Sequence, residues 1–211
     1  MRAQSSAQSS AQAAERVDGR VARSIRTRAA VVDALLALLE RGELRPTVGR
    51  IAEEAGISAR SVYVHFEDLD DLFAAAAQRQ SERFLPLVET VPVDAPLDVR
   101  VERFTESRAR LLDAIHPVRR AAVLNEPFLP ALARLLAGAR ARERAELARV
   151  FRRELDVHAG ARRRRLLAAL DAMTGWPAWD TWRTQHGLTA RAARQTMAES
   201  ITDLLQTHEP T

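Results

Sequence analysis

The chain has 211 residues, 46% of them hydrophobic, and 32 basic against 28 acidic side chains give it a net charge of +4 at neutral pH. That length suffices for one sizeable core or two small ones, and no run of about 18 apolar residues predicts a membrane span. The sequence has no cysteine, which excludes disulfide bonds and thiolate metal sites and suits a cytoplasmic protein. All the basic residues are arginine, and the net charge permits a polyanionic partner without requiring one.

The first 20 residues are rich in Ser, Gln and Ala and have no apolar periodicity. We expect a disordered tail there, because the segment also lacks the apolar core of a signal peptide. From Ser24 onward, apolar residues recur at helical spacing in two neighbouring rows. These rows are Val31, Leu35 and Leu38, and Val32, Leu36 and Leu39. They predict an amphipathic helix over 24–41, ended by Gly42.

Three helices are predicted next, over 48–55, 58–65 and 68–85, with Thr47, Ser58 and Asp68 at their starts. Gly56 ends the first of them at a tight turn, where a positive φ is favoured. Ala52 is small, as it must be where the next helix crosses. The inward positions are Ile51, Ala55, Ile57 and Val62. This spacing predicts a helix-turn-helix, although it also fits a plain helical hairpin with a solvated face.

The second helix of this unit carries short polar groups and one forked cation on its predicted exposed face. These residues are Ser58, Ala59, Arg60, Ser61, Tyr63 and His65. Such a face suits a helix that enters the major groove of DNA. Arg60 is the candidate for guanine readout, because a guanidinium group matches the O6 and N7 acceptors of guanine.

The segment from Ile25 to Leu72 resembles the DNA-binding domain of the TetR (tetracycline-repressor) family. The resemblance rests on TVGRIAEEAGISARSVYVHFEDLDDL, preceded by the helix AAVVDALLALLERG. It implies a homodimer, a pseudo-palindromic DNA operator and a C-terminal domain with a variable ligand pocket. Two positions depart from the family pattern: Leu69 stands where a phosphate-binding Lys is common, and Val64 where an aromatic residue is common.

Tyr63 and His65 are then expected to hold phosphates, while Phe66 turns inward and locks the recognition helix to the next helix. Thr47 and Arg50 complete the set of expected DNA contacts. Between residues 20 and 66, eight Arg stand against five acidic residues, a net charge of +3. Four of these arginines precede the first helix core: Arg20, Arg23, Arg26 and Arg28. They form a basic arm that either reaches the DNA or remains solvated.

Beyond a break at 91–96 (VPVDAP), further helices are predicted over 97–115, 117–124, 128–158, 161–184 and 189–207, the fourth interrupted at Trp176-Pro177. The sequence therefore predicts an all-α protein with a tail (1–20), a helix-turn-helix domain (21–66), a connecting helix (67–90) and a helical regulatory and dimerisation domain (91–211). Candidate pocket residues are Phe84, Phe104, Arg108, His116, Asn125, Phe128, Met173 and Trp176. Each also fits an ordinary core or surface role.

The last two helices carry apolar rows that we assign to a dimer interface, as the family resemblance implies. The rows are Leu166, Leu167 and Leu170, and Ala193, Met197, Ile201 and Leu204. Trp176, Trp179 and Trp182 recur at i, i+3 and i+6, which favours packing over a ligand cage. No catalytic, metal or cofactor motif is present. We therefore expect a DNA-binding regulator, most simply a repressor released by an unknown small molecule. The alternatives are a helical adaptor without DNA binding, or a regulator without a ligand.

Overall fold

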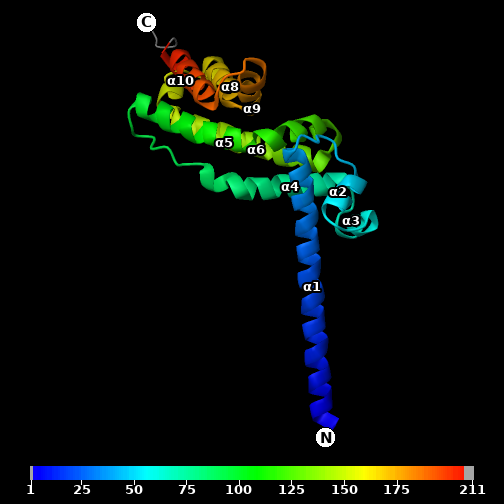
Figure 1. Ribbon diagram of the computed structural model, residues 1–211. Helices are drawn as coiled ribbons and strands as arrows, with labels where there is room; N and C mark the ends of the chain where they lie inside the picture. Colours follow the sequence, from blue (N-terminus) through cyan, green and yellow to red (C-terminus); the bar gives the residue numbers. More distant parts are fainter. Residues whose placement is uncertain (1, 207–211) are drawn as a thin grey trace. The chain divides into compact units, whose positions relative to one another are not determined.

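Residues 2–206 form helices joined by turns and short loops, and this is the part whose backbone the computed structural model describes; side chains are described from residue 19 (Figure 1). Over that range no strand is formed, which confirms the all-α prediction. No helix in the described part of the chain has the length and apolar character that crossing a bilayer requires.

The N-terminal helices are α1 (Arg2–Glu40), α2 (Val48–Glu54), α3 (Ala59–His65) and α4 (Leu69–Phe84). The later ones are α5 (Leu97–Asn125), α6 (Pro130–Val150), α7 (Arg152–Asp156), α8 (Gly160–Thr174), α9 (Trp176–Asp180) and α10 (Ala190–Gln206). Short 3₁₀ turns, η1 (Leu85–Leu87) and η2 (Glu126–Phe128), and one π-helical turn, η3 (Thr181–Gln185), complete the list.

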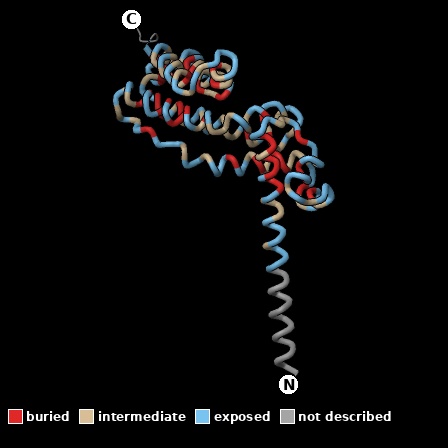
Figure 2. Tube along the Cα trace, in the orientation of Figure 1, coloured by how far each residue is buried: buried red, intermediate tan, exposed pale blue. Residues whose placement is uncertain are grey.

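Helix α1 begins at Arg2, whereas the sequence predicted a disordered tail followed by a helix from residue 24. The physical reason is that the segment contains no proline and many Ala and Gln residues, which have high helix propensity. Among the described side chains of α1, the two apolar rows are buried, while residues 19–26 are almost all exposed (Figure 2).

Two predicted helix boundaries differ from the structure for local reasons. Pro117 lies inside α5, which continues to Asn125, so the predicted helices 97–115 and 117–124 are one. The predicted helix 128–158 divides into α6 and α7 at Phe151, a buried residue with a non-helical ψ. The predicted break at Trp176-Pro177 is confirmed one residue earlier, at Gly175. A Cβ there would lie 3.1 Å from the carbonyl oxygen of Asp171, a tight contact that glycine avoids.

The helices form two compact units. The first contains the chain up to Ala77 together with Ala121–Leu132, and the second contains Gln78–Arg120 and the chain from Ala133 onward. In the first unit, both carboxylate oxygens of Asp70 accept hydrogen bonds from the backbone N–H of Ala131, and Oδ1 also from that of Leu132 (2.8–3.1 Å). Asp70 of α4 thus caps the first turn of α6, whose N–H groups have no partner within their own helix.

The second unit has an apolar core that contains buried arginine–glutamate ion pairs. Arg100 is 2% exposed and binds both carboxylate oxygens of Glu154 at 2.5 and 2.9 Å, while its other N–H groups reach the carbonyls of Ala95 and Val150. The fork geometry of arginine satisfies all of these acceptors at once. The buried side chain of Arg100 therefore lies between α5 and α7 with hydrogen-bond partners for its guanidinium group.

Candidate nucleic-acid interface

The turn between α2 and α3 has the backbone geometry of a helix-turn-helix. Gly56 has φ +66°, its N–H donates to the carbonyl of Glu53 (3.1 Å), and the N–H of Ile57 donates to that of Ala52 (3.0 Å). This pair of bonds is the Schellman ending of a helix, which places glycine in the left-handed region. Ile51 and Ala52 are buried beneath it. The turn is thus fixed by its own local bonds, as the sequence predicted.

Each helix of the unit also begins at the predicted cap. The hydroxyl of Thr47 accepts the N–H of Arg50 at 3.3 Å, and that of Ser58 accepts the N–H of Ser61 at 3.1 Å. Ser58 and Ser61 further share a hydrogen bond between their hydroxyls (2.8 Å). These bonds satisfy N–H groups at the helix starts. Thr47 and the two serines of the predicted contact set therefore have a structural role.

Helix α3 turns one face to solvent and one face to the core. Val62 and Phe66 are buried, as predicted for Phe66, whereas Tyr63 is 58% and Val64 73% exposed. Ala59 and Arg60 are also exposed, and Ser61 and His65 are half-buried. The side chain of Arg60 makes no hydrogen bond or ion pair with any described residue. A large aliphatic side chain, an unpaired cation and a phenol thus share the outer face.

Arg28 fastens this helix to α1. Its Nη1 donates to the carbonyl oxygen of His65 at 2.5 Å, its guanidinium lies 4.1 Å from the centroid of the Phe66 ring, and its Nη2 lies 3.6 Å from a carboxylate oxygen of Asp71. The sequence predicted that Arg28 belongs to a basic arm that reaches DNA or solvent. That prediction is wrong for Arg28, because its side chain contacts residues inside the first unit.

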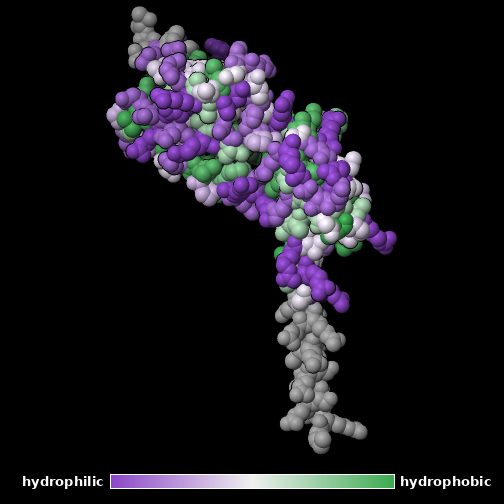
Figure 3. All heavy atoms as spheres, viewed as in Figure 1, coloured by the Kyte–Doolittle hydropathy of each residue, from purple (hydrophilic) through white to green (hydrophobic). Residues whose placement is uncertain are grey.

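Several other arginines of this unit are also paired internally. Arg50 hydrogen-bonds Glu53 and lies 3.8 Å from Glu43, and the bond to Glu53 raises the pKa of Arg50. Arg41 pairs with Glu54 at 2.6 Å. Arg60 and the three arginines at the described start of α1 (Arg20, Arg23 and Arg26) remain unpaired among the described side chains. Figure 3 shows hydrophilic side chains gathered where the described side chains of α1 begin.

Residues 31–76 match the family model of the TetR bacterial regulatory proteins. The matched segment contains α2, α3 and the turn between them, so this part of the chain is a TetR-family DNA-binding domain. The protein is accordingly a DNA-binding transcriptional regulator. A comparison with curated protein sequences gives no significant match.

The fold of the regulator resembles several solved structures. A TetR-family regulator from Rhodococcus has a TM-score of 0.65 at 18% identity, covering 85% of this chain and 99% of that one. A transcriptional regulator from Pseudomonas aeruginosa PAO1 has a TM-score of 0.63 at 22% identity, with coverage of 85% and 90%. The multidrug binding protein EbrR, complexed with imidazole, has a TM-score of 0.58 at 21% identity, with coverage of 82% and 94%. These likenesses show the fold alone.

The eight predicted pocket residues divide between the two units of the regulator. Asn125 and Phe128 belong to the first unit, where Asn125 donates to the carbonyls of Leu44 and Ala121 and Phe128 is 69% exposed beside Arg45. The remaining six belong to the second unit: Phe84, Phe104, Arg108, His116, Met173 and Trp176. The prediction therefore grouped residues that do not share one unit.

Among those six, the polar residues already have partners. Arg108 is 4% exposed, lies 3.4 Å from Glu143 and 3.5 Å from Glu146, and its guanidinium is 5.1 Å from the centroid of the Phe104 ring. His116 Nε2 lies 3.0 Å from Asp180 Oδ1. Arg108 thus neutralises two carboxylates of α6, which sequence spacing within α5 alone cannot reveal.

The predicted dimer rows require a correction. Leu166, Leu170, Ala193, Met197 and Ile201 are all at most 3% exposed in the single chain, where they form part of the core of the second unit. They pack against each other because α8 and α10 are neighbours in the same unit. Leu167 and Leu204 are half-buried and flank that core. An amphipathic helix shows which face is apolar, but not whether its own chain covers that face.

Proposed function

We propose that the regulator represses transcription by binding an inverted-repeat operator as a homodimer, and that a small molecule bound in its second unit releases it. The observation that carries the DNA part is Arg60, which is exposed, has no partner among the described residues and stands on the outer face of a helix that is capped at its start and pinned by Arg28 at its end. An unpaired guanidinium on a helix that is fixed at both ends is available for base readout.

The dimer part rests on a size argument. The recognition helix has seven residues and reaches only a few base pairs, which specify no unique site in a genome. Two copies related by a two-fold axis double the readout and fix the spacing of the half-sites. Because the predicted rows are buried, the proposed interface is the outer face of α8 and α10, which we define as Arg165, Ala169, Thr196, Ser200 and Leu204.

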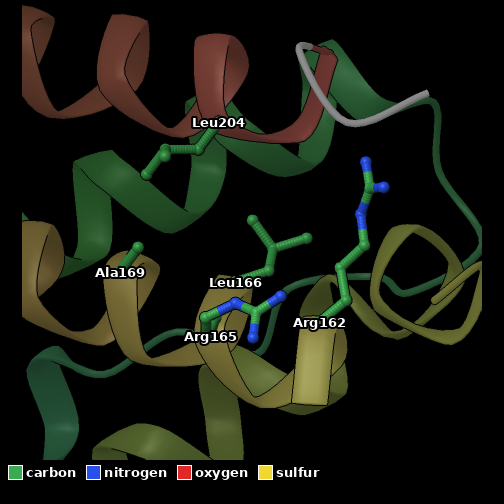
Figure 4. A pocket seen from close by; sticks show the side chains of 5 residues that line it. All are labelled: Arg162, Arg165, Leu166, Ala169 and Leu204. Atoms are coloured by element: carbon green, nitrogen blue, oxygen red, sulfur yellow. The ribbon is translucent and has the colours of Figure 1, made fainter. Parts of the chain in front are cut away.

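This outer face contains a shallow groove, which Figure 4 shows between α8 and α10. Its volume is about 390 Å³, and it is lined by Arg162, Arg165, Leu166, Ala169 and Leu204. Short side chains beside the groove let a second pair of helices approach closely. A four-helix contact on this face would leave the core rows undisturbed.

The ligand part is supported by the separate helical unit that carries no DNA-binding element. The structurally similar EbrR, a multidrug binding protein, is complexed with imidazole. By analogy, we propose that the second unit of this regulator holds a small molecule and that its occupancy lowers operator affinity through linkage.

The decisive experiment combines light scattering with titration of the DNA upstream of the regulator's own gene. We expect two chains per operator fragment, and an operator that is an inverted repeat. Leu204→Arg should yield a folded monomer with weakened operator binding, while Glu199→Arg, an exposed change on the same helix, serves as the control. A wild-type monomer that binds a single half-site tightly would contradict the dimer.

A further inference from the structure

All three tryptophans of the regulator lie within seven residues of each other, in the core of the second unit. Trp179 is fully buried, and Trp176 and Trp182 are 8% exposed. The indole nitrogens of Trp176 and Trp179 are buried and have no hydrogen-bond partner among the described residues. The indole nitrogen of Trp182 does not belong to these buried donors without a partner. Two neighbouring N–H donors, three residues apart on α9, are therefore left without an acceptor.

An unpaired donor in a protein interior is costly. Folding removes the hydrogen bond between the N–H and water without replacing it. Natural proteins therefore pair almost all buried polar groups with protein, water or ligand. One such group is an isolated exception, but two on successive turns of one short helix form a pattern. The pattern calls for an acceptor that the described chain does not itself provide.

The local backbone around these donors is irregular. Gly175 separates α8 from α9, and α9 continues directly into the π-helical turn η3, closed by the N–H of His186 on the carbonyl of Thr181 (3.1 Å). The N–H of Leu188 then reaches the carbonyl of Trp182 (2.9 Å). π-Helical turns are rare and are found frequently at functional sites. This segment is bounded by a glycine and a wide turn, which suits it to small displacements.

Two polar pairs hold the segment against α5. His116 Nε2 lies 3.0 Å from Asp180, and Arg183 Nη2 lies 3.3 Å from Asp113. The His116 ring is also 6.1 Å from that of Trp176, tilted by 37°. All four side chains are partly exposed. Partly exposed pairs of this kind contribute little stability each. Breaking them to admit a ligand from solvent therefore requires little free energy.

We propose that Trp176 and Trp179 bind the effector, and that the effector is a neutral, planar aromatic compound with a carbonyl or ring-nitrogen acceptor. The inference rests on the proposed ligand-controlled release and names its site and ligand class. An acceptor follows from the two indole donors. A flat ring follows from the indoles and from Met173, which packs against the same core. Neutrality follows because His116 and Arg183 already face carboxylates, so a buried anion would lack a free cation.

Quinoline and naphthalene test this directly, because they have nearly the same shape and only quinoline has an acceptor nitrogen. Calorimetric titration of the full-length wild-type chain should show quinoline binding roughly three- to ten-fold more tightly than naphthalene, the worth of one hydrogen bond. Trp176→Phe/Trp179→Phe should abolish the preference, whereas Trp182→Phe, which loses the same ring volume as either of those single changes, should retain it. Circular dichroism checks that each variant is folded.

Equal affinities for the two probes in the wild type, no binding of quinoline, or a preference that survives in the double variant would each overturn the inference. Release of labelled operator is measured beside these titrations. If quinoline binds through the indoles without releasing the operator, the site stands and the proposed ligand control fails. If solvent-extracted metabolites release the operator equally from the wild type and the double variant, ligand control stands and this site is wrong.

Discussion

The guanidinium group of Arg28 lies 4.1 Å from the centre of the Phe66 ring and donates a hydrogen bond to the carbonyl oxygen of His65. These two contacts join α1 to the residue that ends the recognition helix and to the aromatic ring behind it. Because α3 has only seven residues, it has little stability of its own and depends on such contacts for its orientation.

Arg28→Ala should lower the free energy of unfolding by about 1–2 kcal/mol, the worth of one cation–π contact and one charge-assisted hydrogen bond. It should also weaken operator binding, because α3 loses a fixed position. Denaturant unfolding and DNA titration measure the two effects. Arg26→Ala is the matched control, since it removes the same charge from an exposed, unpaired position of α1. Equal losses of stability in both variants would contradict the assigned role.

Arg60→Ala should reduce the affinity for the specific operator by about 1–3 kcal/mol and relax the preference at one base pair in each half-site. The reason is that the forked guanidinium matches the two acceptors of a guanine. Competition binding against a set of single-base operator variants measures the preference. Equal losses on operator and on random DNA would show that Arg60 contacts phosphates only.

Tyr63→Phe and His65→Ala should weaken binding to all DNA sequences to a similar degree, because phosphate contacts carry no sequence information. Tyr63→Phe removes a neutral hydrogen bond and should leave the salt dependence unchanged. If His65 makes an ionic contact with a phosphate, His65→Ala should flatten the salt slope by roughly one phosphate unit. The measurement is affinity against salt concentration for each variant. A change in sequence preference without a change in non-specific affinity would sink the assignment.

Met197→Arg should unfold the second unit or destabilise it by about 4 kcal/mol or more, because Met197 is fully buried and the new charge would be removed from water. Thermal unfolding followed by circular dichroism gives the result. The contrast with Leu204→Arg, a half-buried position on the same helix, separates the inner row from the outer face. A folded monomeric Met197→Arg would restore the buried row as the dimer interface.

Glu154 should contribute stability that is lost in acid. Burial alone would raise the pKa of Glu154, but the hydrogen bond from Arg100, a backbone hydrogen bond and nearby positive charges together lower it. A carboxyl whose folded pKa is depressed stabilises the fold above its unfolded pKa of about 4.3, and this contribution disappears as pH falls through the folded value. Glu154→Gln should therefore lose less stability than the wild type between pH 7 and pH 3, measured by urea unfolding. Parallel pH curves would refute this.

The first unit was largely predictable because its signals are local. The left-handed turn at Gly56 and the caps at Thr47 and Ser58 depend on residues no more than a few positions apart, so spacing alone identifies them. The role of Arg28 was not predictable in this way. Its partner His65 lies 37 positions along the chain, and an arginine before a helix looks the same whether it faces DNA or a neighbouring ring.

In the second unit, tertiary packing overrode local rules. Pro117 ends a helix by propensity, yet α5 continues through it, because other contacts along its 29 residues outweigh one missing hydrogen bond. The rows on α8 and α10 are apolar as predicted, but most of their residues are buried within their own chain, because periodicity does not show what lies opposite a helix face. The unpaired indole nitrogens have no sequence signature at all, because pairing is a property of the folded interior.

The Asp70 cap on α6 has a consequence for the synthesis of the protein. The DNA-binding unit draws on two separate stretches of chain, and its carboxylate clamp on Ala131 and Leu132, like the bond from Asn125 to Leu44, forms only after the ribosome has released the start of α6. Once α4 has been synthesised, more than forty further residues must be translated before Asp70 can make these bonds. Chaperones that engage emerging chains would therefore meet α1–α4 before the second stretch of this unit has joined them.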